Sequence, residues 1–195
     1  MAEGKCHTAN VDGWNVSWET RGDYRLWCKQ EQPSNTQQAV VVMFNPGSLS
    51  GGGEKLRRDT TLRILREIFA GTGYNPYIVN LFSLATPKPW ELFDAWPNRD
   101  CPGFGVNDLA WAECSAVLYA YGAYESENGY AESIKDRIRE IRSVLSEIPE
   151  IVVPLAKTGT PKHPMRMQIE GLKSEFQKLI AAHAAANNSL QARRP

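Results

Sequence analysis

Hydrophobic and polar residues follow two different patterns along this chain. Between residues 14 and 28, apolar side chains alternate with polar ones on both sides of Arg21-Gly22-Asp23, which predicts a β-hairpin. Later runs are apolar throughout and rich in branched or aromatic residues, which is typical of parallel strands covered on both faces. These runs are residues 39–44, 77–82, 116–121 and 151–156. They predict a four-stranded parallel sheet.

Helical periodicity fills the intervals between these runs. Asp59 is suited to cap a helix that stops at Gly71. Apolar residues three or four positions apart predict two further helices, over residues 134–148 and 172–180. Because strands alternate with helices, we expect an α/β fold, a three-layer α/β/α sandwich around the four-stranded parallel sheet with an N-terminal β-hairpin.

The length and composition fit one domain. A chain of 195 residues with 42% hydrophobic residues can bury a single sizeable core. We divide it into a hairpin extension (1–38), an α/β core (39–183) and a flexible tail (184–195). Residues 83–107 contain four prolines and several aromatic residues, which predicts a long, packed surface loop.

Charge and hydropathy indicate whether the chain is suited to bind nucleic acid or a membrane. Lysine plus arginine equals aspartate plus glutamate at 22 each, so any affinity for nucleic acid must come from a local patch. The N-terminus lacks the apolar core of a signal peptide, and no stretch approaches the ~20 apolar residues of a membrane span. We therefore expect a soluble, cytoplasmic protein without a membrane partner.

The four cysteines show no C-x-x-C spacing, and a chain of this size does not need disulfide bonds, so reduced thiols are expected. A zinc or iron-sulfur site that uses Cys6, His7 and the other cysteines, Cys28, Cys101 and Cys114, is the alternative. We expect no metal and no cofactor.

Polar residues gather where the predicted strands end. Asn45-Pro46-Gly47-Ser48 follows the first strand, Asn80 lies in the second, Gly122-Ala123-Tyr124 follows the third, and His163 comes after the fourth. Carboxyl ends of parallel strands form the ligand-binding edge of open α/β sheets. Each piece also has an ordinary interpretation, because Asn-Pro-Gly is a common turn, an asparagine can cap a strand, and a loop histidine is often solvated.

Taken together, these motifs resemble the uracil-DNA glycosylase superfamily. Met43-Phe44-Asn45-Pro46-Gly47 is similar to its first motif, Val79-Asn80-Leu81 to its base-reading strand, and His163-Pro164 to the start of its last motif. The order and spacing agree across residues 39–170. With Tyr24-Arg25-Leu26-Trp27 and Asp59-Thr60-Thr61 added, the chain also resembles a bacterial and phage family of unknown function.

The resemblance implies a DNA glycosylase, which hydrolyses the bond between a base and its sugar. Asn45 would orient the attacking water, His163 would donate a hydrogen bond to the departing base, and Asn80 would read the edge of a flipped pyrimidine. The other implied substrate-binding residues are Phe44, Pro46, Gly47, Ser48, Phe82, Gly122 and Tyr124. The implied DNA contacts are Lys55, Arg57, Arg58, Lys162 and Arg166.

Two departures from the superfamily shape the expected substrate. Met165-Arg166-Met167 stands where many members have a serine-rich wedge loop, and glycine stands where the pocket aromatic residue is expected. A roomier pocket favours a bulky pyrimidine, such as hydroxymethylated or glucosylated cytosine of phage DNA, and suggests a role in phage defence. The expected partner is single- or double-stranded DNA, bound by a monomer. Two alternatives remain: a hydrolase of free nucleosides or nucleotides, and a non-catalytic nucleic-acid-binding module.

Overall fold

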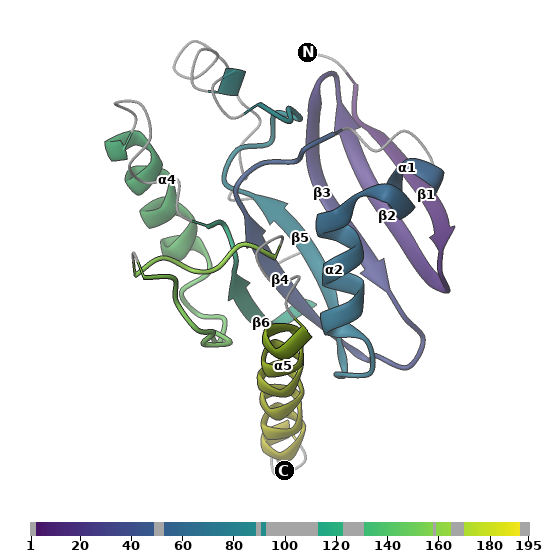
Figure 1. Ribbon diagram of the computed structural model, residues 1–195, viewed down its shortest axis with the longest axis vertical. Helices are drawn as coiled ribbons and strands as arrows, with labels where there is room; N and C mark the ends of the chain where they lie inside the picture. Colours follow the sequence, from purple (N-terminus) through teal and green to yellow (C-terminus); the bar gives the residue numbers. More distant parts are fainter. Residues whose placement is uncertain are drawn as a thin grey trace.

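A six-stranded mixed sheet forms the centre of the molecule (Figure 1). The computed structural model describes residues 3–48, 53–88, 91–92, 113–122, 131–157, 159–164 and 170–191. The strand order is β1-β2-β3-β5-β4-β6. The strands are β1 (Lys5–Val11), β2 (Trp14–Arg21), β3 (Tyr24–Glu31), β4 (Gln37–Met43), β5 (Tyr74–Asn80) and β6 (Cys114–Tyr119). The helices are α1 (Gly53–Arg58), α2 (Thr60–Phe69), α4 (Ala131–Val144) and α5 (Glu170–Gln191).

The predicted fold class, a three-layer sandwich around a four-stranded parallel sheet, is wrong. Three of the predicted parallel strands exist, because β4 pairs in parallel with both β5 and β6. The predicted hairpin is β2 and β3, but it is not a separate extension. It joins the same sheet through antiparallel pairing of β3 with β5, and β1 adds a strand that was not predicted. The sheet is therefore mixed and six-stranded, not parallel and four-stranded.

The fourth predicted strand, over residues 151–156, is also wrong. Ile151 donates its backbone N–H to Val117, and Val117 donates to Pro149, but the segment then leaves the sheet. Val152 is 75% exposed and Leu155 is 56% exposed, so this apolar run is not covered on both faces. Residues 151–156 therefore have the sequence pattern of a buried strand but form a partly exposed segment at the surface.

Helices α1 and α2 lie on one side of the sheet, whereas α4 lies on the other side at the parallel strands β4, β5 and β6 (Figure 1). Alternate residues of β1 and β2 remain exposed or partly exposed. Alternate residues of β4 point into the two cores. Ala39, Val41 and Met43 belong to the core beneath α2 and α5, whereas Val40 and Val42 belong to the core on the α4 side. This double burial explains why β4 is apolar at every position from Ala39 to Met43.

The first predicted helix is confirmed as α2. Asp59 has extended backbone angles, and its side chain accepts a hydrogen bond from the Leu62 N–H at 3.0 Å, as an N-cap residue does. The helix ends at Ala70, and Gly71 follows with φ of 68°, a left-handed conformation that favours glycine. The cap fixes where α2 begins, and this start lies beside the cavity described below.

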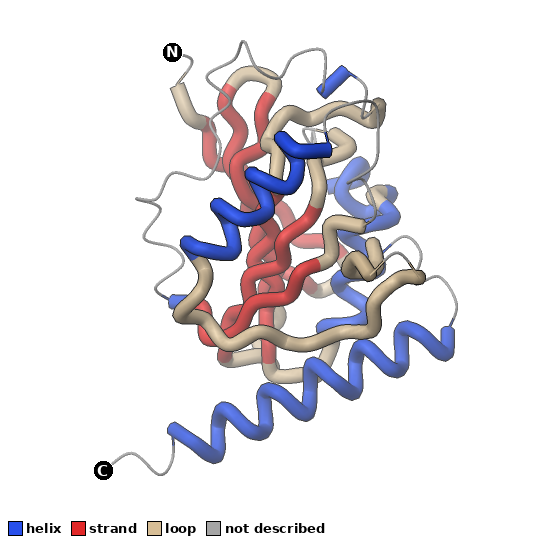
Figure 2. The backbone as a smooth tube through the Cα atoms, turned by 90° about the vertical axis from the view of Figure 1, so that its left-hand side faces the viewer, coloured by secondary structure: helices blue, strands red, loops and turns tan. Residues whose placement is uncertain are grey.

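The prediction of a flexible tail over residues 184–195 is wrong for residues 184–191, because α5 continues to Gln191 and forms the long helix beside the C-terminus in Figure 2. Residues 192–195 lie outside the described residues. Ala184 is buried, and Asn187 donates to the Tyr74 hydroxyl and to the Ser115 carbonyl. An alanine-rich segment has high helix propensity, and these contacts hold it against the sheet. The helix predicted over residues 134–148 occurs as α4, which begins earlier and ends at Val144.

The packing of α5 gives a prediction for the pH dependence of stability. Burial lowers the pKa of His183, whose Nδ1 lies 3.0 Å from the Tyr74 hydroxyl oxygen. Because folding disfavours the charged imidazole, the free energy of unfolding should fall as the pH drops below about 6.5, and the loss should end below the folded-state pKa. In urea titrations between about pH 7.5 and 5, His183→Gln should show a shallower fall than the unmodified protein. Equal slopes would contradict the assignment.

Candidate functional site

A cavity of about 530 Å³ lies at the carboxyl ends of β4 and β5. From β4 the chain crosses through α2 to β5 on one side, and β6 pairs with β4 on its other side. Such a reversal of strand order is where open α/β sheets bind ligands. The lining residues are Arg25, Met43, Asn45, Gly47, Ser48, Lys55, Arg58, Asp59, Thr60, Thr61, Leu62, Ile78, Asn80 and His163.

Asn45 is held in one orientation by two backbone carbonyls. Its Nδ2 donates to the Thr86 carbonyl at 2.8 Å and to the Pro46 carbonyl at 3.2 Å. Both partners are acceptors, so only the amide nitrogen can face them. The Oδ1 atom is left without a hydrogen-bond donor among the described residues, on a half-buried side chain that lines the cavity. It is therefore a fixed acceptor that a water or ligand can reach.

Asn80 is the last residue of β5 and pairs in register with Met43 of β4. Its side chain is 1% exposed and lines the cavity. Its Nδ2 is buried and has no hydrogen-bond partner within the described part of the chain. An unsatisfied buried donor costs about 1–3 kcal/mol. A ligand that accepts from this nitrogen would recover that cost.

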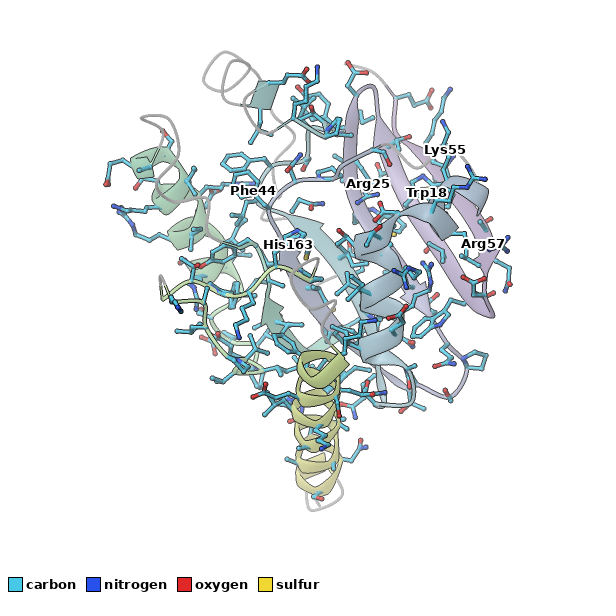
Figure 3. All side chains as sticks on the ribbon, in the orientation of Figure 1. Trp18, Arg25, Phe44, Lys55, Arg57 and His163 are labelled. Atoms are coloured by element: carbon cyan, nitrogen blue, oxygen red, sulfur yellow. The ribbon has the colours of Figure 1, made fainter. Side chains whose placement is uncertain are left out.

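His163 is brought to the cavity by a tight turn. Gly159 has φ of 78°, its N–H donates to Ala156, and the Ala156 N–H donates to Thr160. An antiparallel bridge between Leu155 and Pro161 then redirects the chain toward the sheet. Figure 3 shows the half-buried His163 near the middle of the molecule. The turn thus carries a residue far along the chain to the end of β4 and β5.

The charged residues of the cavity are mostly basic. Arg25 on β3 is only 3% exposed, and Lys55 and Arg58 come from α1. Asp59 is the one acidic side chain among the described lining residues, and one of its oxygens caps α2. The chain as a whole has no net charge, so the excess of cationic groups is local to this cavity.

Seven of the predicted site residues line this cavity: Asn45, Gly47, Ser48, Lys55, Arg58, Asn80 and His163. The others that the structure describes do not. Phe44 and Phe82 pack edge to face, 5.3 Å apart, in the core on the α4 side. Arg57 pairs with Asp12 at 3.1 Å on the outer side of α1. Pro46, Gly122 and Lys162 also lie outside the lining, and the predictions for Tyr124, Arg166 and most of the 83–107 loop fall outside the described residues.

Four polar residues of the cavity were not predicted as site residues: Arg25, Asp59, Thr60 and Thr61. A signal for them exists in the sequence, because both stretches belong to the motifs that resemble a family of unknown function. Arg25 is also an arginine within a strand of the predicted hairpin, and that strand, β3, belongs to the sheet. A charged residue at such a position is rarely buried without a specific purpose.

The thiols of the described residues do not form a metal site. Cys6, Cys28 and Cys114 form no disulfide bond within the described residues, and burial raises the pKa of the Cys28 and Cys114 thiols to about 11 each. Both are therefore protonated at neutral pH and are poor ligands. No group of three or more histidine, cysteine or acidic side chains suited to a metal occurs in the described ranges, and His7 bonds to Thr20.

No helix among the described residues is long and apolar enough to cross a membrane. A family model described as a protein of unknown function (DUF1643) matches residues 24–165. This match includes every residue that lines the cavity. No curated protein matches the chain, and no solved structure matches it.

Proposed function

The chain belongs to the DUF1643 family, and we propose that it is a DNA glycosylase that removes a flipped, modified pyrimidine and leaves an abasic site. The observation that supports the proposal is the meeting of Asn45, Asn80 and His163 in one cavity. These residues are far apart in the sequence and have complementary chemistry. We expect the enzyme to act as a monomer in the cytoplasm, where phage DNA with modified cytosine would be its target.

In the proposed reaction, Asn45 positions the nucleophile. Its Oδ1 would accept a hydrogen bond from a water, while its Nδ2 stays bound to the Thr86 and Pro46 carbonyls. An amide is too weak a base to take a proton, so its contribution is orientation of the water against C1′. The water oxygen bonds to C1′ as the C1′–N bond breaks, and the bonding electrons leave with the base.

Asn80 and His163 act on the base. The buried Nδ2 of Asn80 would donate to an oxygen or ring nitrogen on the pyrimidine edge, which supplies its missing acceptor. His163 would donate a hydrogen bond to the negative charge that develops on the departing base. The proton lost by the water then neutralises the released base, directly or through solvent, so the products are the neutral base and a sugar with a hydroxyl group on C1′.

The space beside Asn45 favours a substituted pyrimidine. A Cβ atom added to Gly47 would have no other atom within 4 Å, and Gly47 lines the cavity. The cavity of about 530 Å³ corresponds to roughly 18 water molecules, which is more than an unsubstituted ring requires. A hydroxymethyl or glucosyl group on cytosine would fill this space.

Filling the space at Gly47 should therefore change the substrate preference. Gly47→Leu should lower base release from DNA with glucosylated cytosine by about tenfold or more, and should affect unsubstituted cytosine or uracil much less. Its backbone is not left-handed, so a side chain does not strain it. The control is Asn10→Leu, an exposed position of β1 that does not line the cavity. Equal losses on all substrates would contradict a pocket for the substituent at this position.

The test of the proposed function is mass spectrometry of bases released from a panel of normal and phage-modified DNAs. Release of one modified pyrimidine, with alkali-labile sites in the same DNA, would support the proposal. Retarded DNA mobility without base release from any substrate would instead identify a binding module.

A second candidate is hydrolysis of a free nucleotide. The observation in its favour is that Arg25, Lys55 and Arg58 gather at the cavity, whereas Arg57 is paired with Asp12. Cations gathered in a pocket suit a compact anion better than a long DNA backbone. Release of a base from monomers, with intact DNA left untouched, would favour this candidate.

A further inference from the structure

The cavity has a second functional region beside the base-reading residues, at the start of α2. Arg25, 97% buried, and Arg58, at the end of α1, line the cavity where α2 begins. Lys55 adds a third positive charge, and Asp59 is the one opposing carboxylate among the described lining residues. Three cationic side chains against one carboxylate make this end of the cavity suited to an anionic group.

The first turn of α2 supplies hydrogen-bond donors to the same place. The helix has ten residues, and Asp59 accepts only the Leu62 N–H of its first turn. The backbone N–H groups of Thr60 and Thr61 donate to no other described residue, and both residues line the cavity. Free N–H groups and the helix dipole together favour an anion at a helix N-terminus.

An independent observation indicates that a ligand is required. The Asn80 side chain is 99% buried, lines the same cavity, and leaves its Nδ2 without a partner in the described part of the chain. Asn80 is on β5, whereas the cationic groups are on β3 and α1. A ligand with an acceptor at one end and a negative charge at the other satisfies both sets of groups at once.

We infer that Arg25, Arg58 and the first turn of α2 bind a phosphate group of the substrate nucleotide whose base reaches Asn80. The recognised unit is therefore a nucleotide with its phosphate. A nucleoside or free base lacks the phosphate that Arg25, Arg58 and the first turn of α2 would bind. The identity of the base rests on the proposed function, whereas the phosphate subsite is tested separately by binding. The phosphate belongs either to a nucleoside monophosphate or to the backbone of DNA.

Calorimetry on Asn45→Ala protein, which should not turn over substrate, measures this subsite directly. Four probes are compared: 5-hydroxymethyldeoxycytidine, its 5′-monophosphate, inorganic phosphate, and a trinucleotide with 5-hydroxymethylcytosine at its centre. We expect the monophosphate or the trinucleotide to bind at least about tenfold more tightly than the nucleoside, because charge-assisted hydrogen bonds are strong. Inorganic phosphate should compete with the tighter of the two. Equal affinity for nucleoside, monophosphate and trinucleotide would overturn the inference.

Two neighbouring arginines of α1 provide a matched comparison. Arg58→Gln should abolish most of the preference for the phosphate, whereas Arg57→Gln, which removes the same charge from the residue paired with Asp12, should leave the preference within about twofold. Both side chains are exposed, so both variants should fold. Equal effects of the two substitutions would mean that only the general charge of α1 matters, and would overturn the subsite.

Asp59→Asn gives the opposite expected change. Asparagine caps a helix as well as aspartate does, so α2 should keep its start while the opposing negative charge is removed. Phosphate affinity should rise severalfold. A fall in affinity with unchanged thermal unfolding would contradict a phosphate at this end of the cavity. If binding depends on the phosphate but no base is released from any DNA, the proposed glycosylase activity is rejected and the phosphate subsite is retained. If a base is released but binding does not depend on the phosphate, the subsite is rejected and the glycosylase activity is retained.

Discussion

Asn45→Ala should lower the rate of base release from modified DNA by at least about 100-fold, because the water then has no fixed acceptor that directs it to C1′. The reason is specific to this structure, since the Thr86 and Pro46 carbonyls hold the amide nitrogen of Asn45, a residue that lines the cavity. Rates are measured under single-turnover conditions from the appearance of alkali-labile sites. Asn10→Ala, an exposed asparagine of β1, is the control.

Asn45→Asp distinguishes orientation from base catalysis. A carboxylate is the stronger base, but it cannot donate to the Thr86 and Pro46 carbonyls and would place an oxygen against one of them. We therefore expect this variant to be impaired at neutral pH as well. Activity at or above that of the unmodified protein would show that proton abstraction, and not the locked amide, limits the reaction.

His163→Ala should lower base release by about 10²–10³-fold, the usual effect of removing one preorganised donor to a developing anion. His163→Gln should recover part of this loss, because a glutamine amide can donate to the same oxygen. The expected effect should grow with the basicity of the leaving pyrimidine. Chemistry is measured with the same single-turnover assay on a series of pyrimidines.

The control for His163 is His7→Ala. The His7 ring stacks on Trp18 in the sheet, and His7 does not line the cavity. Thermal unfolding of both variants separates loss of folded protein from loss of chemistry. If His163→Ala retains full activity while it stays folded, the histidine only shapes the cavity wall. The leaving base would then need a different donor.

The sequence predicts well those helices and strands whose pattern depends on neighbouring residues, such as a helix cap or a run of buried side chains. The start of α2 follows from Asp59 as N-cap, and the end follows from Gly71. Uniformly apolar runs identify β4, β5 and β6 because each is covered on both faces. The run at residues 151–156 has the same composition but lies outside the sheet, since composition alone does not show what covers a segment.

The pairing of strands is a property of the whole chain, and it is where the prediction fails. The antiparallel contact between β3 and β5 joins Cys28 to Ile78, fifty residues apart, and no local pattern marks it. Without this contact, the hairpin looks like a separate extension. With it, the hairpin brings Arg25 to the cavity that Asn80 also lines.

The sequence by itself determined which chemistry is present: two asparagines and a histidine near predicted strand ends, and a helix that starts at Asp59. It determined these because side-chain type, turn formation and helix capping depend on a few neighbouring residues. Only the tertiary structure decided that Asn80 leaves a buried donor unpaired, that Phe44 and Phe82 belong to a core, and that Arg58 but not Arg57 faces the cavity. Burial and orientation depend on what packs against each residue, which long-range pairing sets.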